Sequence, residues 1–342
     1  MLDNQTALGD AHVDSIAPYA EGKFHFTDQL ALTLGARYSV EHKTGYTDHI
    51  GSSPFYGGAF DVPFGHTWSD FTPRGILEFK PNHDMLFYGS VSTGFKGGGW
   101  SLTSTSPAKA VIPLSPETST SYELGAKLHL FENRLAVNLA AYQADTTNLQ
   151  VRSLVGPVLT DTNAGHERVR GVEIESTLTP FHGAEFGINY AYTEAIYTKF
   201  AGCAVGVDCS GKTVPYVPKN DVRLFAQYRW DMPSIDGSLT FHVDDQYASR
   251  TQVSPLDNQQ PAVPFTEKKG ILNASLIYAP QNAPWTIQLW GKNLTNVAAM
   301  AAPSNYYFYF LTTAEYAAGA REVDRGVVSP PREIGATFTY KF

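Results

Sequence analysis

One segment of the chain has the residue types and spacing of a phosphate-binding loop. Gly206, Gly211, Lys212 and Thr213 satisfy the formula G-x-x-x-x-G-K-[ST], in which backbone amides and the lysine hold the phosphates of a nucleotide. A functional loop of this kind opens a helix whose N-terminus helps to bind phosphate. The next residues here are VPYVP, and two prolines within five residues prevent that helix. We therefore do not expect nucleotide binding.

Other patterns for catalysis or metal binding do not occur in the sequence. The 10 histidines are scattered, with no H-E-x-x-H pair, and neither a G-x-S-x-G motif nor paired-cysteine zinc spacing is found. Cys203 and Cys209 are the only 2 cysteines, and both lie in a segment that we expect to be an external loop. An oxidising compartment favours a disulfide between them, which would contribute roughly 2 kcal/mol on the loop-entropy model, and two free thiols are the alternative. We expect no enzyme activity, no cofactor and no metal site.

Composition and charge exclude several classes of protein. The 342 residues carry 25 Lys and Arg against 33 Asp and Glu, a net charge of −8, without a basic cluster that would bind nucleic acid. With 13% aromatic residues the chain is too rich in core-forming side chains to be disordered. Apolar runs are far shorter than the roughly 18 to 20 residues of a membrane-spanning helix. Residues 1–14 lack the features of a secretory signal peptide, so we expect either a cytoplasmic protein or a chain without its natural N-terminus.

Apolar and polar residues instead alternate along most of the chain. In residues 30–38, for example, Leu30, Leu32, Leu34 and Tyr38 share one face of an extended segment. Such alternation predicts an all-β fold of about thirteen antiparallel strands, each longer than a typical soluble strand. We expect them near 15–26, 30–43, 67–80, 84–97, 117–131, 133–150, 166–180, 183–199, 219–232, 235–250, 266–280, 283–296 and 331–342.

The predicted connections alternate between two lengths. Six are short and polar, and the six between them are long, near 44–66, 98–116, 151–165, 200–218, 251–265 and 297–330. Short turns on one side and long loops on the other are typical of a transmembrane β-barrel of the bacterial outer membrane. Aromatic residues flank the short turns, as a membrane interface favours. A soluble β-sandwich would have shorter strands, and an odd strand count suggests the later part of a larger barrel.

The polar face of these strands would line the lumen. We expect its charged residues to contact an internal domain or to form ion pairs, and these are Arg37, Arg74, Glu78, Glu123, Lys127, Glu173, Glu175, Arg223 and Arg229. Aromatic residues in the predicted loops are candidates for ligand contact, with loop packing as the alternative. These candidates are Trp100, Tyr306, Tyr307, Phe308, Tyr309 and Phe310.

The C-terminal residues and several longer segments carry a family resemblance. Phe338, Tyr340 and Phe342 share the apolar face of the last strand, and such an ending resembles the signal read by the barrel-assembly machinery. The segments YGSVSTGFKGGG (88–99), SPETSTSYELGAKLHLFENRLAVNLAAYQADTTNLQV (115–151), NAGHERVRGVEIE (163–175), WTIQLWGKNLTN (285–296) and PPREIGATFTYKF (330–342) occur in the order seen in one family. Together they resemble the C-terminal barrel of TonB-dependent outer-membrane receptors, over essentially the whole chain.

The resemblance implies a barrel of about 22 strands around an N-terminal plug domain, with a TonB box near its N-terminus. Neither the plug nor the box is found in this sequence, so we expect residues 1–342 to be the C-terminal part of such a barrel. The resemblance also implies TonB-dependent uptake of a scarce nutrient, most often a ferric siderophore. The outer-membrane lipid and the barrel-assembly machinery would be its other partners. A passive porin and a soluble β-sheet adhesin or lectin are the alternatives.

Overall fold

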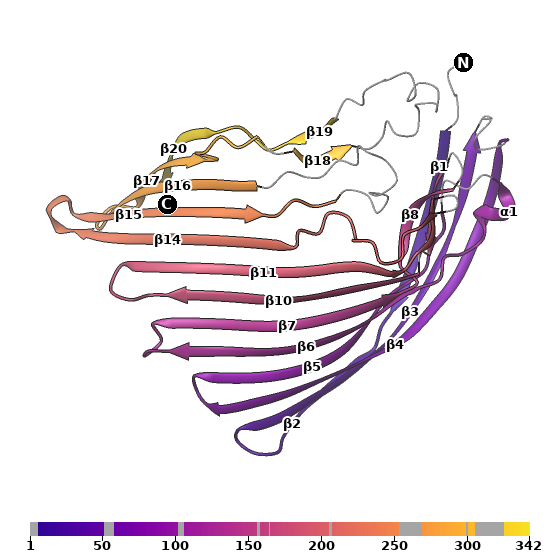
Figure 1. The fold of residues 1–342 in the computed structure, drawn as a ribbon, viewed down its shortest axis with the longest axis horizontal. Coiled ribbons are helices and arrows are strands. Elements are labelled where there is room, and N and C mark those ends of the chain that lie inside the picture. Colours follow the sequence, from indigo (N-terminus) through magenta and orange to yellow (C-terminus); the bar gives the residue numbers. More distant parts are fainter. Residues whose placement is uncertain are drawn as a thin grey trace.

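The computed structural model describes residues 6–50, 58–101, 106–155, 158–163, 165–204, 207–252, 269–298, 300–304 and 325–342. Its main feature is one curved, antiparallel sheet of 14 strands, in which β1 and β2 both pair with β3 and each later strand of the sheet pairs with the next one (Figure 1). These strands are β1 (Thr6–Ile16), β2 (Tyr19–His25), β3 (Leu30–Ile50), β4 (Phe60–Asn82), β5 (Met85–Lys96), β6 (Glu117–Leu130), β7 (Leu135–Thr147), β10 (His166–Leu178), β11 (Ala184–Lys199), β14 (Asn220–Met232), β15 (Gly237–Ala248), β16 (Lys269–Pro280), β17 (Trp285–Lys292) and β20 (Glu333–Tyr340).

The first two strands occupy a single position in the sheet. Both pair with β3 in one continuous register, from Ile16 opposite Val40 to Tyr19 opposite Arg37. Pro18 separates them, because proline has no amide hydrogen to donate to the ladder, although its carbonyl still accepts from Tyr38 at 3.0 Å. The predicted count of thirteen strand positions is therefore confirmed. The predicted first strand, 15–26, began too late, since its pairing starts at residue 6.

The two ends of the sheet differ as the sequence predicted. The short turns after β2, β4, β6, β10, β14 and β16 lie at one end, and the long connections lie at the other (Figure 1). The prediction of a loop over 44–66 is wrong for most of that interval. β3 continues to Ile50 and β4 begins at Phe60, because β-branched and aromatic residues there extend the ladder beyond the membrane.

The long connections contain structure of their own. Their described residues form three hairpins and one short helix, which are β8 (Gln150–Val155) with β9 (Val158–Asn163), β12 (Ala201–Ala204) with β13 (Val207–Asp208), β18 (Met300–Ser304) with β19 (Arg325–Val328), and α1 (Pro107–Ala110). A single 3₁₀ turn, Pro233–Ile235, joins β14 to β15. Within the described residues, no helix has the length and hydrophobicity to cross a membrane.

Strand register carries each face of the alternation across the whole sheet. One row of paired residues runs Leu32, Leu77, Gly89, Leu124, Ala141, Val172 and Tyr192, from β3 to β11. We call this face the outer face. Its apolar side chains are bare in the isolated sheet, since Leu124 is 69% exposed and Phe338 is 65% exposed. A continuous apolar face of this size is costly in water and is stable against lipid.

Aromatic side chains border the outer face beside the short turns. Tyr228 and Trp230 lie edge to face with ring centroids 4.5 Å apart, and Tyr278 lies 5.7 Å from Trp285. On β20, Phe338 stacks on Trp285 at 6.1 Å. Amphipathic rings prefer the boundary between lipid and water, so this belt marks the periplasmic edge of the membrane.

Two edges of the sheet have no partner strand among the described residues. The path of pairing begins at β1 and β2 and ends at β20, and these edge strands do not pair with each other. With thirteen antiparallel positions, the first and last strands run in the same direction. They could meet only as a parallel pair, so an odd number of further strands is needed to close an antiparallel barrel.

Candidate ligand-binding mouth and lumen wall

The residues that alternate with the outer face form a polar inner face. All nine charged residues predicted for the lumen lie on it, because register opposes them only to other inner-face positions. For example, Lys127 pairs with Asn138, which pairs with Glu175. Small residues alternate with these charges, as where Glu173 lies between Ala140 and Ala191. The inner face therefore has the hydrophilic surface that a water-filled or plugged lumen requires.

Ion pairs between β2 and β4, across β3, and a hydrogen bond between β5 and β6 hold several of these inner-face groups. Arg74 donates to Glu21 at 2.9 Å, and Lys23 forms an ion pair with Glu78. Tyr88 donates its hydroxyl to Glu123 at 2.6 Å. Because most of these side chains are substantially exposed, each pair contributes only about 0 to 1 kcal/mol. Their main consequence is to fix where charge is presented to the lumen.

At the extracellular end, the connection between β5 and β6 folds onto the inner face of β3 and β4. Trp100 stacks on Phe64 with ring centroids 4.3 Å apart and meets Trp68 edge to face at 5.2 Å. Phe64 and Trp68 are both buried in this contact. Trp100 also donates its indole N–H to the carbonyl of Val111 at 3.3 Å. The loop is thus packed into the wall of the mouth, with Trp100 half-buried at its surface.

A glycine and a lysine set how closely this loop approaches the strands. Lys43 on β3 donates to the carbonyl of Gly98 at 2.8 Å, bonds Glu41 at 3.1 Å and lies 5.5 Å from the centre of the Trp68 ring. A Cβ atom at Gly98 would come within 2.1 Å of the carbonyl oxygen of Leu114 and 2.4 Å of the Trp68 ring. Only glycine fits at this position, in the middle of the glycine run before Trp100.

The hairpin of β8 and β9 ties the same loop to the strands beside it. Gln150 donates its side-chain amide to the carbonyls of Gly97 and Ser115, at 3.2 and 3.1 Å, and its backbone N–H to Glu117 at 2.6 Å. Asn163 exchanges hydrogen bonds with the backbone of Ser115 at 2.8 and 2.9 Å. These bonds connect the β8–β9 hairpin to the loop between β5 and β6 at the mouth.

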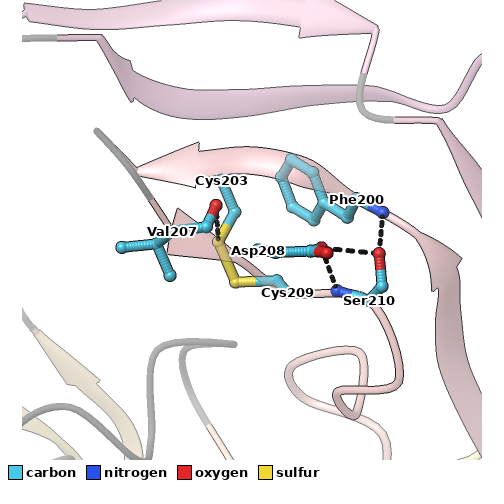
Figure 2. The surroundings of a disulfide bond; sticks show 6 residues. All are labelled: Phe200, Cys203, Val207, Asp208, Cys209 and Ser210. Carbon is cyan, nitrogen blue, oxygen red and sulfur yellow. Dashed lines mark hydrogen bonds between the residues drawn. A yellow bond between two sulfur atoms is a disulfide. The ribbon is translucent and has the colours of Figure 1, made fainter.

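Cys203 and Cys209 are joined by a disulfide in the connection after β11, with Cα atoms 6.0 Å apart (Figure 2). Both cysteines are buried in a small apolar cluster with Tyr197 and Phe200, against which Leu149, Val151, Val207 and Val214 pack. Leu149 and Val151 belong to the segment before and within β8. The disulfide loop therefore packs on the hairpin that anchors the Trp100 loop.

Hydrogen bonds from Ser210 shape the last turn of the disulfide loop (Figure 2). The Asp208 carboxylate accepts hydrogen bonds from the Ser210 hydroxyl at 2.6 Å and from the Ser210 backbone N–H at 2.8 Å. These bonds hold the pKa of the Asp208 carboxyl below its ordinary value. Phe200 in turn donates its backbone N–H to the Ser210 hydroxyl at 2.9 Å. The described part of the phosphate-loop formula, 207–213, thus spans β13, Cys209 of the disulfide and the turn that follows it. Among the described residues of 207–218 no helix follows it.

The remaining predicted site residues have two outcomes. Tyr306, Tyr307, Phe308, Tyr309 and Phe310 lie outside the described residues. Phe338 and Tyr340 lie on the outer face of β20, opposite Ile287 and Trp285, and Phe342 stacks edge to face on Tyr340 at 5.1 Å. Of the predicted ligand contacts, Trp100 is therefore the one that the structure places in the mouth.

Sequence analysis missed the residues that hold Trp100. Phe64, Trp68 and Lys43 lie on strand extensions that were predicted to be a loop or fell at its edge. The signal was present, since Phe60, Phe64 and Trp68 recur at even spacing on one face of β4. Gln150 and Asn163 carry no comparable pattern.

The mouth and the inner face carry groups that can bind a ligand. Among the described residues, no group of three or more His, Cys, Asp or Glu side chains could hold a metal ion. The mouth offers aromatic surface and backbone amides, and the lumen wall offers fixed charges. Such surfaces can capture a ligand by stacking and hydrogen bonding.

Comparisons with known proteins agree with this geometry. Residues 3–294 match the family model described as TonB dependent receptor-like, beta-barrel. The pesticin receptor of Yersinia pestis is 24% identical over 220 residues, which is 63% of this chain and 30% of that protein. The probable TonB-dependent siderophore receptor PiuA of Acinetobacter baumannii is 23% identical over 231 residues, or 64% of this chain and 30% of that protein.

Solved structures show the same fold. The ferric yersiniabactin uptake receptor FyuA from Yersinia pestis superposes with a TM-score of 0.78 at 18% identity, covering 99% of this chain and 47% of that one. The copper transporter OprC superposes with a TM-score of 0.65 at 14% identity, covering 97% and 48%. The chain thus spans less than half the length of these relatives. With its family model matched over most of the sequence, the chain belongs to the TonB-dependent receptor-like β-barrel family of the bacterial outer membrane.

Proposed function

We propose that this chain forms the wall and mouth of a receptor that takes up a scarce nutrient by TonB-dependent transport, most often a ferric siderophore. The observation that carries the proposal is the inner face, where a charged wall leads from an aromatic mouth along the sheet. Relatives named for siderophore or metal uptake support the ligand class.

The proposed receptor contains more than the described sheet. Two open edges in hydrocarbon would leave backbone groups unsatisfied, at several kcal/mol each. We propose that further strands close the barrel and that an internal plug domain contacts the inner-face charges. The chain covers 47% of the FyuA structure and 48% of the OprC structure, which supports this arrangement. Interaction with TonB would then belong to the plug and its TonB box.

In this mechanism the chain's own residues bind and guide, and they perform no covalent step. Trp100 offers an exposed part of its ring at the mouth for stacking, while Lys43 and Gln150 hold its loop in place. Because the loop is already packed, a ligand would meet a preorganised surface and lose less free energy to ordering it. Displacement of the plug would then open the charged wall to the ligand.

Assembly in the membrane requires a separate partner. We propose that the barrel-assembly machinery reads the apolar ending formed by Phe338, Tyr340 and Phe342, which lies on the exposed edge strand β20. The outer face then meets lipid directly.

Binding is tested with the complete receptor purified from outer membranes. Ferric chelates of the catecholate, hydroxamate and carboxylate classes are titrated while tryptophan fluorescence is followed. We expect saturable quenching by one class and at least about fivefold weaker binding by Trp100→Ala, since loss of a stacking partner costs about 1 to 3 kcal/mol. Trp230→Phe, on the periplasmic belt, is the control. Equal affinity of Trp100→Ala and wild type would show that Trp100 does not contact the ligand. If no chelate bound, the proposal that the ligand is a ferric siderophore would be wrong.

A further inference from the structure

A shallow groove crosses the outer face between β3 and β11. Its volume is ≈ 940 Å³, and two neighbouring register rows line it. The first is the row from Leu32 to Tyr192 described above. The second row runs Leu34, Gly75, Val91, Tyr122, Gln143, Arg170 and Glu194. The groove exists because Gly75 and Gly89 place no side chain between the surrounding leucines and valine.

The two ends of the groove differ in chemistry. On β3 to β6 its lining is apolar, with Leu34, Leu77 and Leu124. On β10 and β11 it ends at Arg170 and Glu194, which lie on the extracellular half of their strands, since the turn joining β10 to β11 is a short one. The groove therefore runs obliquely through the outer leaflet, from the hydrocarbon region at β3 to the level of the lipid headgroups at β11.

Arg170 lines this upper end, and Arg168 lies just beyond the groove on the same face of β10; a carboxylate holds each arginine. Arg170 donates its Nε to Glu194 at 2.5 Å, and Arg168 donates its Nε to Asp145 at 2.7 Å. Gln143 also donates to Asp145, at 2.7 Å. Both arginines belong to the outer face of β10, two residues apart and hence about 7 Å along the strand.

The carboxylates leave the ends of the guanidinium groups available. A guanidinium has five N–H donors, and each ion pair here uses the single donor on Nε. The side chains of Arg168 and Arg170 remain 42% and 59% exposed, so both are accessible from outside the protein. A planar guanidinium fixed in this way is suited to bidentate binding of phosphate oxygens.

We propose that this groove binds one phosphorylated lipid of the outer leaflet, with an acyl chain along Leu34, Leu77 and Leu124 and a headgroup phosphate on Arg168 and Arg170. Asp145 and Glu194 balance the two positive charges, so recognition rests on directed hydrogen bonds rather than on net charge. The site lies on the face opposite the lumen and does not depend on which nutrient the receptor takes up.

The test titrates the complete receptor in detergent with defined lipids and counts bound molecules by native mass spectrometry. The probes are lipid A carrying two phosphates, the same lipid without phosphates, and inorganic phosphate. We expect the phosphorylated lipid to bind best, and Arg168→Gln with Arg170→Gln to weaken it by about tenfold, the effect of losing one charged hydrogen bond or more. Arg134→Gln, in a periplasmic turn, is the matched control and should bind as wild type does.

A second variant tests the apolar part of the groove. At Gly75 an added Cβ meets only Leu34 at 3.5 Å and Val91 at 4.0 Å, so Gly75→Val should fold while filling the groove. We expect it to weaken lipid binding without changing the preference for phosphate. Equal binding of the two lipid A forms by wild type would overturn the proposal, even if the arginine variants failed to fold. Displacement of the lipid by inorganic phosphate at equal concentration would also overturn it, because the acyl chain would then contribute nothing.

Discussion

Neighbouring residues on β7 give the sharpest test of which face meets lipid. Leu139 lies on the outer face, paired with Ala126 and Ile174, whereas Asn138 lies on the inner face between Lys127 and Glu175. We expect Leu139→Arg to impair assembly strongly and Asn138→Arg to be mild. The two changes introduce the same charge one residue apart, so composition and sequence position are matched.

The expected magnitude follows from the height of Leu139 in the membrane. It lies four residues above Leu135, where β7 leaves its short turn, which is about 13 Å along a strand and about 10 Å along the membrane normal after tilt. That position is near the middle of an apolar band about 25 Å tall, where an arginine costs about 2 to 4 kcal/mol. At Asn138 a new arginine faces the Glu175 carboxylate in the lumen and changes stability by about 0 to 1 kcal/mol.

The assay measures folding of the complete receptor into outer membranes and its unfolding in urea after extraction. Leu139→Met serves as the control for loss of leucine packing and should assemble as wild type does. The result that would refute the assignment of faces is equal assembly and equal urea midpoints for Leu139→Arg and Asn138→Arg. If Asn138→Arg impaired assembly more than Leu139→Arg, the face that carries Asn138 would be the one that meets lipid.

Three further predictions concern the extracellular loops. In receptor extracted from the cell envelope, Cys203 and Cys209 should resist alkylation until a reductant is added, and labelling of two thiols in the native protein would contradict the disulfide. Gly98→Ala should displace the Trp100 loop, because its Cβ has no room, and should weaken ligand binding about tenfold or more with little change in assembly; an unchanged affinity would show that this packing is dispensable. Ser210→Ala should raise the pKa of Asp208 toward the ordinary value of about 3.9, as followed by NMR of the carboxyl carbon. Because folding lowers the pKa of Asp208, the stabilisation by Ser210 is present at pH values above the pKa of Asp208 in the unfolded chain and is lost as the pH falls through its pKa in the folded protein. A pKa of Asp208 that is the same in Ser210→Ala and wild type would contradict the hydrogen bonds.

The strands of the sheet were predictable because each must satisfy two simple constraints. Lipid on one side and a polar lumen on the other impose strict alternation, as in residues 30–38, and a short turn must follow each downward strand. The same pattern separated the lumen charges from the outer face. The break at Pro18 was not predicted, because the alternation before it is weak in residues 6–14, beyond the membrane band.

The mouth was less predictable, for a physical reason. Outside the membrane both faces of a strand can be polar, and the alternation is weak in β3 beyond Lys43. In β4 before His66 the apolar residues Phe60, Val62 and Phe64 do alternate, and that signal was missed. Contacts such as Gln150 with the Gly97 carbonyl join residues far apart in sequence, and no local pattern encodes them. Trp100 was found by its type alone, and its packing on Phe64 and Trp68 required the fold.

TonB-dependent transport is tested by uptake into cells that carry the complete receptor and otherwise lack receptors for the same chelate. Uptake of the iron-loaded chelate that binds in the titration is measured with and without TonB. We expect uptake to be lost in the strain without TonB, while binding at the cell surface persists in both strains. Uptake that continues at the same rate without TonB would contradict this expectation and would indicate a passive pore.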